Sequence, residues 1–315
     1  MDAEQPTLPD EDLRFDLDQD REVSSLEDSI IKQDLTIGVP VPPSKERSVA
    51  AFDSRGSGNE PRNITGAALD HLKSAALDEG SIPDFIVESD QVNPHLVSIT
   101  HPNSAFVEEY RSLRTQILQA NQKRRLKSIV VASVSPAEGK SITSLNLAWL
   151  LAQTDGARTL LIDGDLRMPS LAKYLGFDAR EGFSDVLAGE VSLRKSLIRL
   201  QPAGLYLVPA GGERPDVAEL LSGPRFTEIL FEAGGIFDFT IIDVPPIGVF
   251  TDASVAINAA DGTLLVVRAG QTGFKNVERA LENLSREKML GVVLNQSEEL
   301  RMGNSYYDYP YSKNY

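Results

Sequence analysis

The segment Ser133–Thr143 constrains the fold of this chain more than any other, because it joins a strand pattern to a helix pattern. The apolar run Ser128–Ala132 precedes it, and Leu145–Leu151 follows it with apolar residues at helical spacing. A loop that ends at a helix N-terminus attracts phosphate, because backbone N–H groups and the helix dipole both favour an anion there. We therefore expect Lys140 to reach the outer phosphates of a nucleotide and the Ser141 hydroxyl to bind Mg²⁺.

The general phosphate-loop pattern, G-x-x-x-x-G-K-[ST], is met only at its end, because Val134 stands where the first glycine belongs. The alternative explanation of the triplet is a helix that happens to begin with Gly-Lys-Ser. If the loop does bind ATP, its contacts are expected from eight successive residues: Ser135, Pro136, Ala137, Glu138, Gly139, Lys140, Ser141 and Ile142.

Two further apolar runs end in carboxylates. Arg158–Ile162 leads into Asp163, Asp165 and Arg167, and Phe237–Ile242 leads into Asp243. Ligand sites in open α/β sheets lie at the carboxyl ends of the strands, and an aspartate after an apolar strand is the Walker B arrangement. We therefore expect these aspartates to meet beside Lys140.

Strand and helix patterns alternate through the rest of the chain, which predicts an α/β fold with a doubly wound, mostly parallel sheet. The expected strands are 205–209, 262–267 and 290–294, and the expected helices are 216–221, 224–233 and 274–285.

The charge of the chain is concentrated at its N-terminus. Residues 1–100 carry 21 Asp and Glu against 8 Lys and Arg, which accounts for most of the net charge of −15. With its prolines and glycines, the region 1–92 is expected to be largely disordered, as a solvated tether or as a docking segment for a partner. The acidic balance argues against nucleic-acid binding.

Other features exclude several classes of protein. The chain has no cysteine, and its three histidines all precede the phosphate loop, which argues against zinc and histidine-based catalysis. No run approaches the roughly 18 apolar residues of a membrane span, so no direct membrane insertion is expected.

The stretch 106–119 predicts a helix with an apolar face formed by Phe106, Tyr110, Leu113 and Ile117. Glu108, Arg111 and Arg114 recur every three residues on another face. Spacing alone favours a solvated stripe with pairing inside the helix, although arginine also binds carboxylates of a second subunit well.

The chain ends in a tyrosine cluster. Five of its eight tyrosines fall in the last ten residues, namely Tyr306, Tyr307, Tyr309, Tyr311 and Tyr315. A mobile tail is expected here, and tyrosines in such a tail serve either as stacking surfaces or as phosphate acceptors.

Together these motifs resemble the bacterial tyrosine kinases of capsule and exopolysaccharide biosynthesis, of the CpsD/CapB type. The resemblance runs from about residue 93 to Tyr315. It rests on Glu108-x-x-Arg111-x-x-Arg114, the phosphate loop, Asp163-x-Asp165-x-Arg167, Asp243-x-Pro-Pro246 and the tyrosine tail. The implied domains are the N-terminal region 1–92, a P-loop kinase domain of MinD/ParA-like fold at 93–303, and the tail 304–315.

The resemblance implies an autokinase that uses ATP and Mg²⁺ to phosphorylate the tail tyrosines between neighbouring subunits. It assigns catalysis to Lys140, Asp163, Asp165, Arg167 and Asp243, with Ser141, Asp165 and Asp243 at the metal. Asp163 would accept the tyrosine proton. Glu108, Arg111 and Arg114 would form a ring-like homo-oligomer, which reverses the interpretation from spacing. A membrane-bound polysaccharide co-polymerase would recruit this cytoplasmic protein to the inner face of the plasma membrane and activate it.

Two rival functions remain. A MinD/ParA-type positioning ATPase shares the fold, but those proteins carry a lysine early in the loop, where this chain has Ser135. A scaffold without activity would need none of the metal and phosphate positions, all of which are present.

Overall fold

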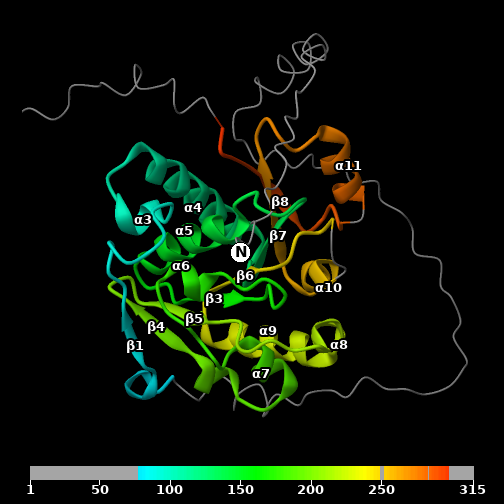
Figure 1. Ribbon diagram of the computed structural model, residues 1–315. Coiled ribbons are helices and arrows are strands. Elements are labelled where there is room, and N and C mark those ends of the chain that lie inside the picture. The colour runs from blue at the N-terminus through cyan, green and yellow to red at the C-terminus, as the bar shows by residue number, and fades with distance from the viewer. Residues whose placement is uncertain (1–76, 249–251, 283, 298–315) are drawn as a thin grey trace, which may run out of the picture. The chain divides into compact units, whose positions relative to one another are not determined.

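A computed structural model describes residues 77–248, 252–282 and 284–297 of the chain. The described residues form an eight-stranded sheet covered by helices (Figure 1). The strands are β1 (Asp84–Ile86), β2 (Ser128–Ser133), β3 (Thr159–Asp163), β4 (Ile198–Gln201), β5 (Leu205–Val208), β6 (Phe239–Asp243), β7 (Gly262–Arg268) and β8 (Met289–Asn295). The helices are α3 (Val97–Thr100), α4 (Ala105–Arg124), α5 (Lys140–Ala152), α6 (Leu171–Tyr174), α7 (Phe183–Ala188), α8 (Val217–Ser222), α9 (Pro224–Ile236), α10 (Asp252–Ala259) and α11 (Phe274–Glu282), with short 3₁₀ turns at Glu79–Ser81 and Leu193–Ser196.

The order of strands across the sheet is β1-β4-β5-β3-β6-β2-β7-β8. Every neighbouring pair is parallel except β4 and β5, which are antiparallel. The strands β3, β6 and β2 lie side by side at the centre, so their carboxyl ends open at one edge of the sheet. The predicted doubly wound, mostly parallel α/β fold is confirmed.

Alternate residues of the central strands enter two separate cores, as the twofold period of a strand requires. In β2, Ile129 and Val131 pack with α4 and α5, whereas Val130 and Ala132 pack with α7, α8, α9 and α10. Figure 1 shows these two groups of helices on opposite faces of the sheet. Because both faces are covered, the strands read as continuous apolar runs in the sequence.

The helix α5 is buried along most of its length between the sheet and α4. Its Asn146 side chain accepts hydrogen bonds from the backbone N–H and the hydroxyl of Ser98, at 2.9 and 2.7 Å, and donates to the carbonyl of His95 at 3.1 Å. These bonds attach the segment around α3 to the helix that begins at the phosphate loop.

The sheet includes residues 84–86, which lie inside the region 1–92 that was expected to be largely disordered. Strand β1 pairs in parallel with β4, and Phe85 packs against the ring of Phe177 at 4.6 Å between centroids. Arg199 of β4 binds both carboxylate oxygens of Asp84, at 2.6 and 3.0 Å. A three-residue edge strand held by charged side chains gives no apolar run, which is why composition did not reveal it.

Helix α4 confirms the predicted helix and corrects its buried face. Val107 and Ile117 are fully buried, whereas Phe106, placed on the apolar face by its spacing, is 51% exposed. The helix runs from Ala105 to Arg124 and is longer than the predicted stretch 106–119.

Several predictions concern residues outside the described ranges. These are the disorder of residues 1–76, the mobility of the tail and the placement of the five tail tyrosines. Among the described residues, no helix combines the length and apolar character needed to span a bilayer.

Candidate functional site

The phosphate loop lies between the end of β2 and the start of α5. Gly139 precedes the helix with φ of +90°, a left-handed conformation that favours glycine. A Cβ atom at this position would lie 2.0 Å from Nδ2 of Asn295, so the Asn295 side chain would have to move to admit any other residue. The loop therefore delivers Lys140 and Ser141 to the first turn of α5, where the helix leaves N–H groups free for an anion.

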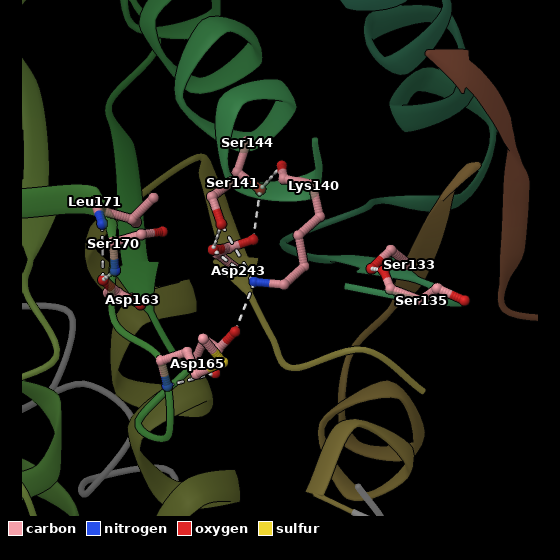
Figure 2. Close-up of polar contacts among 11 residues, drawn as sticks. Ser133, Ser135, Lys140, Ser141, Ser144, Asp163, Asp165, Ser170, Leu171 and Asp243 are labelled. Carbon is pink, nitrogen blue, oxygen red and sulfur yellow. Dashed lines mark hydrogen bonds and ion pairs between the residues drawn. The ribbon is translucent and has the colours of Figure 1, made fainter. Parts of the chain in front are cut away.

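Lys140 joins the ends of two strands (Figure 2). Its Nζ atom lies 2.7 Å from Oδ2 of Asp165 and 3.3 Å from Oδ2 of Asp243. Burial opposes the charge on Lys140, but attraction to Asp243 and Asp165 outweighs it and raises the pKa above its usual value. The lysine is therefore held as a cation in front of the loop.

Asp243, at the end of β6, is completely buried and accepts hydrogen bonds from two hydroxyls of α5. Ser141 Oγ donates to Oδ2 at 2.5 Å, and Ser144 Oγ donates to Oδ1 at 3.2 Å. Burial raises the pKa of Asp243, and the nearby Lys140 and the Ser141 hydroxyl counteract that rise only in part. This aspartate lies where the strand-end argument predicts it.

Asp163 ends β3 directly opposite Asp243 in the parallel register. Its Oδ2 atom accepts the backbone N–H groups of Ser170 and Leu171, at 3.2 and 3.1 Å, and so caps the first turn of α6 (Figure 2). Among the residues that the structure describes, its buried Oδ1 atom finds no hydrogen-bond partner. Burial, followed by the charge of Asp243, raises the pKa of Asp163 to about 7.

Asp165 and Arg167 lie in the turn that follows β3. The Oδ1 atom of Asp165 accepts the backbone N–H of Met168 at 3.1 Å, which leaves Oδ2 to pair with Lys140. Asp165 is buried, whereas Arg167 and Met168 are exposed. The structure thus brings Lys140, Ser141, Asp165 and Asp243 into direct contact and places Arg167 at the surface beside them.

The remaining loop residues predicted at the nucleotide differ in exposure. Pro136 and Ala137 are exposed and Ser135 is half-buried, while the side chain of Ile142, in the first turn of α5, packs against the core. Glu138 is buried and turns its carboxylate back onto the loop, where it accepts the N–H groups of Val134 and Ser135. Only the backbone of Glu138 and Ile142 is therefore available to a phosphate.

The sequence motifs did not predict three polar contacts at this site. They are made by the side chains of Ser144, Thr272 and Asn295. Ser144 follows Ser141 by three residues, the spacing of one helix face, and this is the signal that points to it. Thr272 donates to Glu138, and Asn295 Nδ2 donates to the Glu138 carbonyl at 2.8 Å. The approach of Thr272 and Asn295 depends on the loop between β7 and α11 and on the end of β8, which no local pattern encodes.

The predicted oligomer contact lies on α4. Arg111 pairs with Glu108 three residues earlier, as the spacing within the helix predicts. Arg111 also donates to the carbonyl of Pro102, which precedes the helix, at 2.8 Å. Arg114 is half-buried and donates to the carbonyl of Leu150 in α5 at 3.4 Å. Within one chain, these residues therefore also attach the helix to its neighbours.

The oxygen atoms at the site fit a hard cation. Asp243, Asp165 and Ser141 offer carboxylate and hydroxyl oxygens, which Mg²⁺ prefers, and the Oδ1 atom of Asp163 lacks a partner. In the part of the chain that the structure describes, no three His, Cys, Asp or Glu side chains form a complete metal cage. A magnesium ion held by one or two carboxylates would take its remaining ligands from phosphate and water.

Comparison with known proteins agrees with this geometry. The family model of the CobQ/CobB/MinD/ParA nucleotide binding domain matches residues 129–310, more than half of the chain. The tyrosine-protein kinase YwqD of Bacillus subtilis is 36% identical over 203 residues, which cover 64% of this chain and 85% of YwqD. The succinoglycan biosynthesis transport protein ExoP of Rhizobium meliloti is 34% identical over 224 residues, which cover 70% of this chain and 28% of ExoP.

Among solved structures, the kinase domain of the Escherichia coli tyrosine kinase ETK superposes with a TM-score of 0.62 at 28% identity, covering 65% of this chain and 80% of that domain. The central sheet, the loop before α5 and the aspartates at the ends of β3 and β6 all lie within the matched region of the family model. The chain therefore belongs to the bacterial tyrosine-protein kinases and carries a nucleotide-binding domain of the CobQ/CobB/MinD/ParA family.

Proposed function

We propose that this protein is a tyrosine autokinase that transfers the γ-phosphoryl group of ATP, with Mg²⁺, to the tyrosines of its own C-terminal segment 304–315. The observation that carries the proposal is the convergence of Lys140, Ser141, Asp165 and Asp243 at the N-terminus of α5. A positioning ATPase would need the same four side chains to bind its nucleotide, but the tyrosine cluster would have no role in such a protein.

Each side chain has a distinct task in this proposal. The N–H groups at the start of α5 and the Lys140 ammonium bind the phosphates, and Ser141, Asp165 and Asp243 hold the metal. Bound Mg²⁺ would supply the positive charge that neutralises the β- and γ-phosphate oxygens. Lys140 exchanges its carboxylate partners for phosphate oxygens, since both compete for the same ammonium group.

In the transfer, the bond between the γ-phosphorus and the β–γ bridging oxygen breaks as the tyrosine oxygen bonds to that phosphorus. The phenol proton passes to Asp163, the buried carboxylate with an unpartnered oxygen beside Asp243. Because tyrosine has a pKa near 10, Asp163 first orients the hydroxyl and takes its proton only as the bond to phosphorus forms. Arg167, exposed beside the site, stabilises the charge on the transferred phosphoryl group.

The proposal extends to assembly. Glu108 is exposed and Arg111 is partly exposed on α4, next to exposed Phe106, which supports a contact between copies in a ring-like oligomer. A membrane-bound, polysaccharide co-polymerase-type partner would recruit the kinase to the inner face of the plasma membrane. The name of the relative ExoP supports a role in exopolysaccharide or capsule synthesis and export.

Incubation of the purified full chain with Mg-ATP separates the candidate functions. An autokinase gives a phosphotyrosine signal, which Lys140→Met and removal of residues 306–315 both abolish. The control Lys123→Met, an exposed lysine on α4, keeps the signal. Phosphate release without phosphotyrosine would indicate a positioning ATPase, and neither product would indicate a scaffold. Either result contradicts the proposal.

A further inference from the structure

A buried carboxylate inside the phosphate loop has no part in the proposed transfer. Glu138 is 2% exposed, and its Oε2 atom accepts the N–H groups of Val134 and Ser135, at 2.8 and 3.0 Å. Its Oε1 atom accepts the hydroxyl of Thr272. Because protein donors already engage both oxygens, Glu138 is available neither as a base nor as a metal ligand.

The position of these bonds coincides with the departure from the general loop pattern. Val134 stands in place of the first glycine and keeps an ordinary backbone, whereas Ala137 adopts a left-handed φ of +62°. That conformation is unfavourable for a residue with a Cβ atom, so it needs support from its surroundings. The carboxylate of the next residue, Glu138, closes the loop onto its own beginning and supplies that support.

Glu138 also joins the loop to two other segments. Thr272 belongs to the loop between β7 and α11, and Asn295 ends β8. Asn295 Nδ2 donates to the Glu138 carbonyl at 2.8 Å, while Gly139 allows its close approach. Glu138 therefore connects the phosphate loop to its own first residues, to Thr272 and to Asn295.

We infer that Glu138 is a positioning residue that replaces the missing glycine as the determinant of the loop conformation, and that Thr272 acts through it. The carboxylate holds the loop in the shape that aims its N–H groups and Lys140 at the phosphates. Thr272 orients the carboxylate through the hydrogen bond from its hydroxyl group. This inference rests on the proposed nucleotide site, but not on the transfer of phosphate to tyrosine.

The test measures Mg-ADP affinity of the full chain by calorimetry, with thermal unfolding of each variant recorded alongside. Glu138→Ala leaves two loop N–H groups without their acceptor and is expected to weaken binding about tenfold or more. Glu138→Gln keeps a carbonyl oxygen in reach of those groups and should restore most of the affinity. Rescue by glutamine would show that the acceptor oxygen, and not the negative charge, holds the loop.

Thr272 provides the second pair of variants. Thr272→Val removes the donor and is expected to weaken Mg-ADP binding about threefold to tenfold, whereas Thr272→Ser keeps the hydroxyl and the affinity. In the Glu138→Ala background, Thr272→Val should have no additional effect, because both act through the same carboxylate. If Glu138→Ala does not fold, the Thr272 pair decides the matter alone.

The possible failures are distinct. Absence of Mg-ADP binding by the unaltered chain would contradict both the inference and the proposed nucleotide site. Binding by the unaltered chain with equal affinities in Glu138→Ala, or in Thr272→Val and Thr272→Ser, would overturn the inference and leave the proposed function standing.

Discussion

At the scale of single residues, Asp243 organises the site. It is fully buried, and it accepts hydrogen bonds from Ser141, Ser144 and Lys140. A buried carboxylate is stable only when it is paired and hydrogen-bonded, so these three partners are needed before any nucleotide arrives. The same oxygens then become available to a cation as Lys140 turns to phosphate.

Asp163 gives the residue-scale prediction, because the folded chain raises its pKa to about 7. A raised folded pKa means that the folded state binds more protons than the unfolded state, so stability falls as pH rises from about 4 to about 7. We expect Asp163→Asn to raise the free energy of unfolding by roughly 2–4 kcal/mol at pH 8, with a smaller gain at pH 5.

This prediction is checked by urea unfolding of the metal-free protein, with a chelator present, at several pH values between 4 and 8. Asparagine keeps an oxygen for the N–H groups of Ser170 and Leu171, so the capping contact survives the change. A difference between variant and unaltered protein that stays constant across this range would contradict the assignment.

At the scale of elements, the turn into α5 depends on Gly139. The chain provides a matched control in Gly156, which has a similar φ of +73° but no atom within 4 Å of the position that a Cβ would take. Gly156→Ala should therefore cost about 1 kcal/mol of stability, from backbone strain alone. Gly139→Ala also forces the Asn295 side chain away from the loop and should cost about 2–3 kcal/mol.

Urea unfolding measures both costs, and Mg-ADP binding should be lost in Gly139→Ala and kept in Gly156→Ala. Equal destabilisation by the two substitutions would show that the approach of Asn295 places no constraint on the loop.

Much of the sheet could be predicted from the sequence because strands buried on both faces are continuous apolar runs. Strands β2, β3, β5, β6, β7 and β8 all agree with their predicted positions within a few residues. The edge strand β1 and its neighbour β4 could not be predicted in this way, since Asp84 and Arg199 interrupt any apolar run and pair only in the folded sheet.

The site was predicted to the extent that it follows from strand ends. Asp165 and Asp243 meet Lys140 because parallel strands finish at one edge, a consequence of topology. The hydrogen bonds from Thr272 and Asn295 to Glu138 depend on how segments far apart in the sequence meet. On α4, Phe106 is exposed because Val107 takes the buried position. Neither follows from a local pattern.

At the scale of the whole molecule, each chain carries both a nucleotide site and the proposed acceptor tyrosines. The site of one subunit can nevertheless phosphorylate the tyrosines of another. A chain carrying Lys140→Met keeps its tyrosines and cannot bind phosphate normally. A second chain with phenylalanine at the five tail tyrosines keeps its site. We expect the mixture, incubated with Mg-ATP, to yield phosphotyrosine on the Lys140→Met chain.

Tags of different length separate the two chains on a gel, and each chain alone serves as the control. Phosphotyrosine in the unaltered protein, together with none in the mixture, would show that each subunit modifies only itself.

The central claim is that the Lys140 site directs phosphate to the protein's own terminal tyrosines. Its most direct test is mass spectrometry of the full chain after incubation with Mg-ATP, followed by mapping of the modified peptides. We expect phosphate on tyrosines within 304–315 and none in Lys140→Met. An unmodified terminal peptide in a protein that consumes ATP, or equal modification in Lys140→Met, would contradict this claim.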